Sequence, residues 1–235
     1  MLSGAEITAF IGARAPDPYA LLGMHERGGR LWVTTLQPHA RTVVALDADG
    51  AVIAALPRIH PDGLFDGIVA ERGPRFPYRL RVDWDGSPCD LDDPYRLLPL
   101  LGATDAWLIA EGSHQHLADV LVAHLPSLDG VAGYRFAVWA PNALRVSVVG
   151  DFNHWGGRRH PMRLRRECGV WEIFVPAVSA GNRYKFELLG ASGELLSHKA
   201  DPVAFAAELR PATDSIVSPP RPPATAAGPP ATCDL

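Results

Sequence analysis

The feature that most constrains the fold is an internal repeat that keeps the same order of strand and turn signals in both copies. The matches recur at offsets of 103 to 108 residues: 32–38 with 135–141, 63–66 with 169–172, 78–82 with 184–188, and 93–94 with 201–202. This period is close to the roughly 100 residues of an immunoglobulin-like domain and far longer than a solenoid repeat. The sequence therefore predicts an all-β fold of two tandem immunoglobulin-like β-sandwiches.

Alternation of apolar and polar residues indicates short strands in each copy. In the first copy these are LWVTTL, TVVAL and VIAAL, separated by turns at 37–38 and 47–50. In the second copy strands are expected near 134–139, 144–149, 161–164, 170–175, 183–189 and 194–197. The first two of these flank a turn at 140–142 and are predicted to form a hairpin.

The remaining segments have other patterns. Ser3 and Glu6 have capping-box spacing, so a short helix is expected to begin the chain. Leu117, Val120 and Leu121 follow a helical period, and the segment after 218 is rich in proline. The predicted organisation is a helix at 1–16, a first sandwich at 17–102, a helical connector at 103–130, a second sandwich at 131–217 and a disordered tail at 218–235.

Composition narrows the range of functions. The 235 residues are 47% hydrophobic and 20% charged, with a formal net charge of −4 and no basic run. Nucleic acid and anionic membrane surfaces are therefore not predicted partners. Without a signal peptide or a long apolar span, the protein is expected to be cytoplasmic. Three widely separated cysteines, Cys89, Cys168 and Cys233, argue against a disulfide framework.

Several motifs carry a family resemblance. They are WAPNA at 139–143, VSVVGDFN at 146–153, GRRHPM at 157–162, GVWEIFVP at 169–176, YKFEL at 184–188 and KADPVA at 199–204. Together they resemble the family 48 carbohydrate-binding module of bacterial glycogen branching enzymes, which belong to glycoside hydrolase family 13. DPYALLGMHE at 17–26 resembles the start of the first amino-terminal domain of these enzymes. The resemblance covers nearly everything from 17 to 217.

The resemblance implies a glucan-binding site at Trp155, Lys185 and Asn153, with glycogen or a malto-oligosaccharide as the partner. Physically, the Trp155 indole would cover the apolar face of a glucose ring while Lys185 donates to hydroxyl groups. The kinase-type modules of this family use a second tryptophan, where this chain has Glu194 followed by two leucines. Only one of the two aromatic residues that contact the sugar in those modules is therefore present here.

The alternative for each aromatic residue is a packing role. Trp139 and Trp171 lie on predicted strands and are expected in the core, as are Phe136, Phe174 and Phe186. Trp155 could instead pack against a neighbouring catalytic domain, so its two interpretations remain open.

No catalytic, cofactor or metal site is predicted. His114, His116 and His124 lack a carboxylate or cysteine at ligand spacing. The resemblance places branching activity in a (β/α)₈ barrel, and no residues remain here to build one. The chain is therefore interpreted as a truncated amino-terminal region that supports glucan binding and orients a barrel. The alternative is part of an active branching enzyme whose barrel is supplied in trans.

Overall fold

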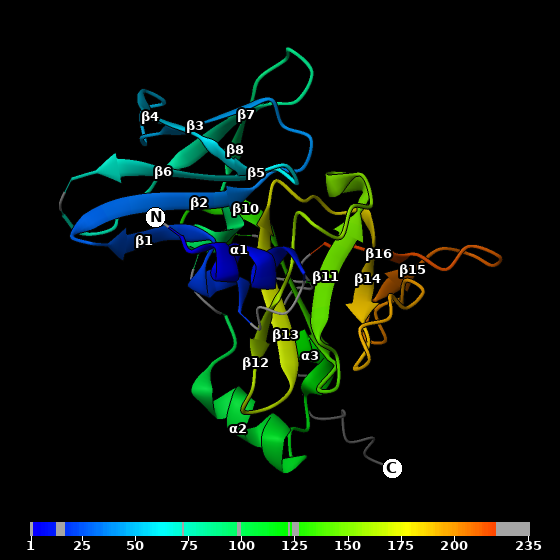
Figure 1. Cartoon of the computed structure of the whole chain (residues 1–235). Helices are drawn as coiled ribbons and strands as arrows, with labels where there is room; N and C mark the ends of the chain where they lie inside the picture. Colours follow the sequence, from blue (N-terminus) through cyan, green and yellow to red (C-terminus); the bar gives the residue numbers. More distant parts are fainter. Residues whose placement is uncertain are drawn as a thin grey trace, which may run out of the picture.

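The computed structural model describes residues 2–12, 17–71, 73–97, 100–121, 123 and 127–219. In this part of the chain, strands form four antiparallel sheets of four strands each (Figure 1). The first sandwich contains one sheet in the order β1 (Gly23–Arg27), β2 (Arg30–Leu36), β6 (Leu64–Ala70) and β5 (Arg58–His60). Its second sheet has the order β4 (Val52–Leu56), β3 (Thr42–Leu46), β7 (Arg79–Asp83) and β8 (Cys89–Asp92). The predicted all-β class is confirmed.

The second sandwich repeats this plan. One sheet has the order β12 (Arg163–Arg165), β13 (Val170–Pro176), β10 (Val131–Trp139) and β9 (Ser127–Leu128). The other has the order β11 (Arg145–Gly150), β14 (Arg183–Leu189), β16 (Ser215–Ile216) and β15 (Ala206–Ala207). Helix α1 (Gly4–Ile11) precedes the first sandwich, and α2 (Ala103–Glu111) and α3 (Leu117–Leu121) lie between the two. Short 3₁₀ turns occupy Pro18–Ala20, Pro94–Arg96 and Asp151–Asn153.

Strand register shows that the sequence repeat is a structural repeat. Leu36 pairs with Leu64 in the first copy, and Trp139 pairs with Val170 at the equivalent place in the second. A glycine with positive φ, Gly63 or Gly169, precedes the second strand of each pair. A Cβ at Gly63 would lie 2.8 Å from the Pro38 Cα, and one at Gly169 would lie 2.7 Å from the Cβ of the equivalent proline, Pro141. Only glycine tolerates both the backbone angle and this contact.

Each sandwich also contains the same buried Tyr–Asp hydrogen bond. The Tyr78 hydroxyl donates to Asp93, and the Tyr184 hydroxyl donates to Asp201 across 2.6 Å. The other carboxylate oxygen accepts a backbone N–H two residues on, across 2.9 Å in both copies. Burial raises the pKa of the Asp93 carboxyl to about 6 and also raises the pKa of Asp201. The repeat therefore includes its buried polar contacts as well as its strands.

The capping box at the start of α1 is present: the Ser3 hydroxyl accepts the Glu6 N–H across 3.3 Å, and Glu6 accepts the Ser3 N–H across 2.8 Å. Phe10 on this helix packs in one hydrophobic cluster with residues of both sandwiches, including Leu36 and Trp171. A separate cluster fills the first sandwich, around Val33, Val43 and Phe65 among others. The two sandwiches therefore pack against each other rather than being connected only by their linker.

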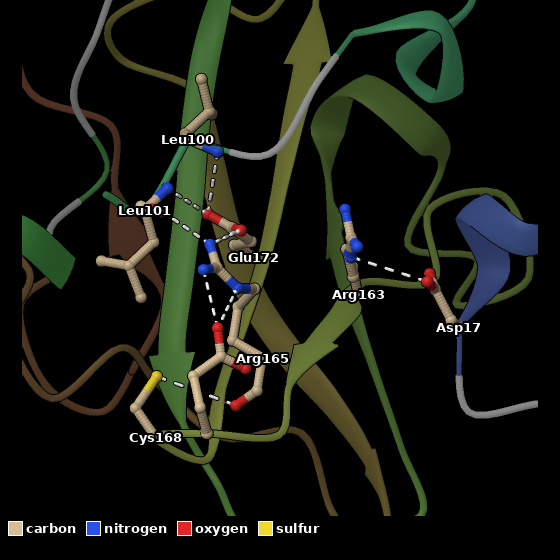
Figure 2. A network of polar contacts seen from close by, with 8 residues as sticks. Asp17, Leu100, Leu101, Arg163, Arg165, Cys168 and Glu172 are labelled. Carbon is tan, nitrogen blue, oxygen red and sulfur yellow. Dashed lines mark hydrogen bonds and ion pairs between the residues drawn. The ribbon is translucent and has the colours of Figure 1, made fainter. Parts of the chain in front are cut away.

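Glu172 on β13 attaches the connector to the second sandwich (Figure 2). Its side chain accepts the backbone N–H groups of Leu100 and Leu101 across 3.2 and 2.8 Å and pairs with Arg165 across 3.1 Å. Arg165 also donates to the Leu101 carbonyl across 2.6 Å. A buried carboxylate with three donors is well satisfied, so this network fixes where the connector begins.

Four sequence-based expectations need correction. β10 and β11 do not form a hairpin, because the turn at 140–144 carries the chain from one sheet to the other. Trp139 is 59% exposed at the end of its strand, whereas Trp171, Phe136, Phe174 and Phe186 are in the core as predicted. The segment 194–197 forms only an isolated bridge at Leu195. Helix α2, which begins after Gly102 without a side-chain cap, was missed because its apolar stripe is weak.

Three further observations concern the described residues only. None of their helices is long and apolar enough to cross a membrane. Cys89 and Cys168 are free thiols, the first exposed and the second buried, while Cys233 lies outside the described part. The predicted tail at 218–235 lies outside it too, except for residues 218 and 219.

Candidate functional site

The candidate site is the turn at 150–157, which follows β11 at one end of the second sandwich. Gly150 begins it, and a Cβ there would lie 2.3 Å from the Arg183 carbonyl oxygen. Asn153 holds it together, because its side-chain oxygen accepts the Gly150 N–H across 2.9 Å and its amide donates to the Val148 carbonyl and the His160 Nδ1, each across 2.9 Å. Asn153 is 2% exposed. Its side chain therefore orders the turn from within.

His160 completes this internal support. Burial lowers the pKa of the imidazole to about 3, so the ring is neutral at physiological pH and its Nδ1 can accept from Asn153. A protonated ring would place a donor where the amide already donates. Neutral His160 is therefore part of the turn's stability.

The backbone of the turn is strained where it presents its aromatic residue. His154 and Trp155 have φ angles of 54° and 60°, so two successive residues other than glycine adopt the left-handed region. Such residues cost about 1 kcal/mol or more each and persist where the surrounding structure fixes them. Here the Trp155 N–H donates to the Gly150 carbonyl across 3.0 Å.

The Trp155 ring is half-buried and lies against His198. It stacks on the His198 imidazole, with centroids 6.5 Å apart and an interplanar angle of 17°. Hydrogen bonds from Arg183 lower the pKa of Asp151, with a smaller contribution from the Trp155 indole. One ring face is thus supported, and the partly exposed indole is held in place by its neighbours.

Lys185 lies on β14 opposite Val149. Its ammonium donates to the Thr213 hydroxyl across 2.8 Å and pairs with Asp214 across 2.9 Å. An ammonium has three N–H donors, so these contacts leave one for a ligand. The two partners come from the segment before β16, far from Lys185 in the sequence.

Ion pairs balance the charge along the outer face of β14. Arg183 pairs with Asp151, Lys185 with Asp214, and Glu187 with Arg145. Gly157 approaches Glu187 so closely that a Cβ on it would lie 2.0 Å from the carboxylate oxygen. This face carries little net charge and offers fixed polar groups beside an aromatic ring, which suits an uncharged polyhydroxyl ligand better than an ion.

Comparisons with known proteins agree with this chemistry. The family model described as carbohydrate-binding module 48 (isoamylase N-terminal domain) matches residues 123–204. The model of the alpha-1,4-glucan branching enzyme GlgB N-terminal domain matches residues 3–95. A 1,4-alpha-glucan branching enzyme GlgB from Rhodopseudomonas palustris (strain BisA53) is 51% identical over 212 residues. The chain belongs to the amino-terminal region of the GlgB family. The module indicates carbohydrate binding.

The alignment covers 90% of this chain but 29% of that GlgB relative. Solved structures are more distant. A pullulanase from Anoxybacillus sp. LM18-11 complexed with maltotetraose is 16% identical with a TM-score of 0.36, covering 84% of this chain and 26% of that one. Ligand-free PulA from Klebsiella pneumoniae gives the same identity and score, covering 84% and 21%. Scores this low do not establish a shared arrangement.

The structure places Trp155 and Lys185 on the same end of the second sandwich, one on the turn and one on the strand beside it. Asn153, the third predicted residue, supports the turn instead of facing outward. Sequence reasoning missed His198 and Asp214, because their contacts with the site exist only in the folded chain. As for the histidines, His114 contacts Asp105 across 3.2 Å and His124 is outside the described residues. No cluster that could hold a metal ion occurs among the described residues.

Proposed function

We propose that this GlgB amino-terminal region binds an α-glucan, glycogen or a malto-oligosaccharide, through the turn at 150–157. The observation that carries the proposal is the half-buried Trp155 indole, supported by His198 and held on strained backbone by the Asn153 hydrogen bonds. Strain of this kind clusters at ligand sites. Lys185 has one ammonium donor left to orient the sugar, and Asn153 acts by positioning the turn.

The expected affinity is low. Stacking that buries about 100 Å² of apolar surface contributes roughly 2–3 kcal/mol at about 25 cal/mol per Å². Each hydrogen bond adds about 1 kcal/mol net. The lost freedom of a flexible sugar opposes both, so a short oligosaccharide should bind at around millimolar concentration. Polymeric glycogen should be retained better, because many sites lie on one particle.

Affinity electrophoresis in glycogen tests the proposal. Trp155→Ala should abolish retention while leaving the melting temperature within a few degrees of the parent, because the ring is partly exposed. Lys185→Ala should weaken retention less, since water replaces part of its polar contact. Trp139→Ala is a matched control: this indole is 59% exposed at the opposite end of the sandwich. Unchanged retention of Trp155→Ala, or its unfolding, would show that the ring only packs.

We also propose that the two sandwiches support and orient a family 13 catalytic barrel and do not transfer glucose units alone. A retaining transfer needs two free carboxyl groups about 5 Å apart on either side of the sugar. The buried carboxylates Asp66, Asp93, Glu172 and Asp201 are each already engaged by an arginine or a tyrosine. Iodine staining of amylose should stay unchanged with this chain, and turnover by the chain alone would contradict the proposal.

A further inference from the structure

A groove of about 600 Å³ lies between the two sandwiches, on the other side of the Trp155 turn. The first sandwich contributes the turns that follow β2 and β7, with His39, Trp84 and Asp85. The second contributes His154 and Arg159 among other residues of its long turn. This volume is within the range of about 300–1,000 Å³ that is usual for small-molecule sites. We call it the Trp84 groove.

Arg159 is the unusual group in this groove. Its guanidinium lies 4.7 Å from the centroid of the Trp84 ring, and its Nε is buried without a hydrogen-bond partner. Among the described residues, no carboxylate lies within ion-pair distance of it. A largely buried guanidinium without acceptors is costly, and its planar N–H groups suit a ligand with several oxygen atoms.

Trp84 is fixed in its place. Its indole N–H donates to the Pro38 carbonyl across 3.2 Å, and part of the ring packs on the core of the first sandwich. The groove also has a strained residue on each wall: His39 has a φ of 64° and His154 a φ of 54°. Two sandwiches thus present left-handed residues to the same space, as at a preformed site.

The groove and the proposed Trp155 site lie on two sides of the same turn, at 150–157. His154 and Gly156 line the groove, while Trp155 between them stacks on His198. The groove offers a donor at Arg159, an acceptor at the exposed Asp85 carboxylate and an aromatic ring at Trp84. Because one side of the groove donates hydrogen bonds and the other accepts them, it suits a sugar chain, whose hydroxyl groups do both. An anion would be attracted by Arg159 but repelled by Asp85.

We propose that the Trp84 groove is a second α-glucan subsite, which takes a further segment of a chain bound at Trp155. The inference rests on the proposed function of the Trp155 turn. Chains too short to reach both sides of the turn occupy Trp155 alone. Longer chains also enter the groove, where hydroxyl oxygens accept from the Arg159 guanidinium. Binding there also joins the two sandwiches through one ligand.

Fluorine NMR of protein containing 5-fluorotryptophan separates the two sites. The chain has six tryptophans, and Trp84→Phe and Trp155→Phe assign the two signals that matter. Maltotriose should shift the Trp155 signal only, and maltoheptaose should shift both. If maltoheptaose shifts Trp155 but not Trp84, the groove proposal fails and the proposed function stands. If Trp84 shifts alone, the Trp155 proposal fails; if neither shifts, both fail.

A substitution series tests the chemistry of the groove. Arg159→Gln should weaken maltoheptaose binding about tenfold, as expected for loss of hydrogen bonds from a charged donor, and should change maltotriose binding less than about twofold. Arg30→Gln is the control, because it removes the same charge from an exposed pair with Glu71. Equal maltoheptaose affinity in parent and Arg159→Gln would overturn the proposal. So would inorganic phosphate shifting the Trp84 signal where maltoheptaose does not, which would make the groove an anion site.

Discussion

The two sandwiches share a scaffold and differ in one turn. Both contain a buried hydrogen bond from a tyrosine to an aspartate, and both pack a glycine of positive φ against a proline. Their central strands also pair in the same register. Strand β11 lies 103 residues after its equivalent in the first copy, β3. Beyond the turn that follows each of these strands, equivalent residues are 106 apart. The first copy joins these segments through a tight turn at 47–51. The second uses 150–157 and carries Trp155 there.

This difference shows which part of the repeated scaffold carries the candidate site. In the first copy, Asp47 closes the turn by accepting the Asp49 and Ala51 N–H groups, across 3.0 and 2.8 Å. In the second copy, the three additional residues give space for a strained, aromatic turn that Asn153 supports from within. Loops tolerate insertions far better than strands do, so binding residues evolve there while the packing is kept.

A second difference concerns the buried carboxylate at equivalent places in β6 and β13. Asp66 pairs with Arg27 across 2.5 Å and accepts from Thr34 across 2.7 Å, all within one sheet. Glu172 instead holds Leu100 and Leu101, which directly precede the connector. The same position thus stabilises one sheet internally in the first copy and attaches a separate segment in the second.

The largest effect should come from removing these carboxylates. Glu172→Ala should lower the free energy of unfolding by about 3–5 kcal/mol, because the Leu100 and Leu101 N–H groups lose their acceptor and Arg165 loses its buried ion-pair partner. Asp66→Ala should destabilise the protein as well. Only Glu172→Ala should speed hydrogen exchange at the Leu101 amide and expose the connector to protease. Equal protection of that amide in both variants would contradict the difference drawn between the copies.

A smaller effect should follow from removing the shared hydroxyls. Tyr78→Phe and Tyr184→Phe should each cost about 1–3 kcal/mol, because each removes the side-chain donor of a buried carboxylate and leaves it only the backbone N–H. The two sites lie in separate hydrophobic clusters, so the double variant should be additive within about 0.5 kcal/mol. Urea unfolding of the four proteins measures this. A clear departure from additivity would mean that the sandwiches do not respond independently.

The smallest net effect on stability should come from a change of pH, because the contributions of Asp93 and His160 to the free energy of unfolding change in opposite directions. The pKa of Asp93 is raised to about 6, so its stabilising contribution is complete below an unfolded pKa of about 3.9 and is lost as pH rises through about 6. The pKa of His160 is lowered to about 3, so its contribution is present above about 6.5 and is lost as pH falls towards 3.

Lowering the pH from 7 to 5 should therefore favour folding by about 1 kcal/mol through Asp93 and oppose it by about 2 kcal/mol through His160. Asp93→Asn should remove the first contribution and His160→Asn the second. Unfolding free energies at the two pH values give both numbers. A parent pH dependence that neither variant changes would show that other groups set it.

Much of this structure was already determined by the sequence. The alternation of apolar and polar residues, the turn residues and the repeat near 105 residues predicted two sandwiches. Alternation at every second residue indicates strands, and turns at short intervals in a domain of this size are typical of a β-sandwich. The capping box predicted α1 for an equally local reason. The motif positions of Trp155 and Lys185 also came from sequence alone, although their binding role stays a prediction.

Tertiary structure decided what local patterns do not encode. The hairpin prediction was wrong because the strand after the turn at 140–144 joins the other sheet and does not pair with the strand before it. Which sheet a strand joins depends on the whole sandwich and not on the turn beside it. Trp139 and Trp171 have similar surroundings in sequence, yet only Trp171 is buried, because burial depends on what packs above a strand end. The His198 support, the Asp214 pair and the Trp84 groove join segments far apart in the chain, and only the folded protein brings them together.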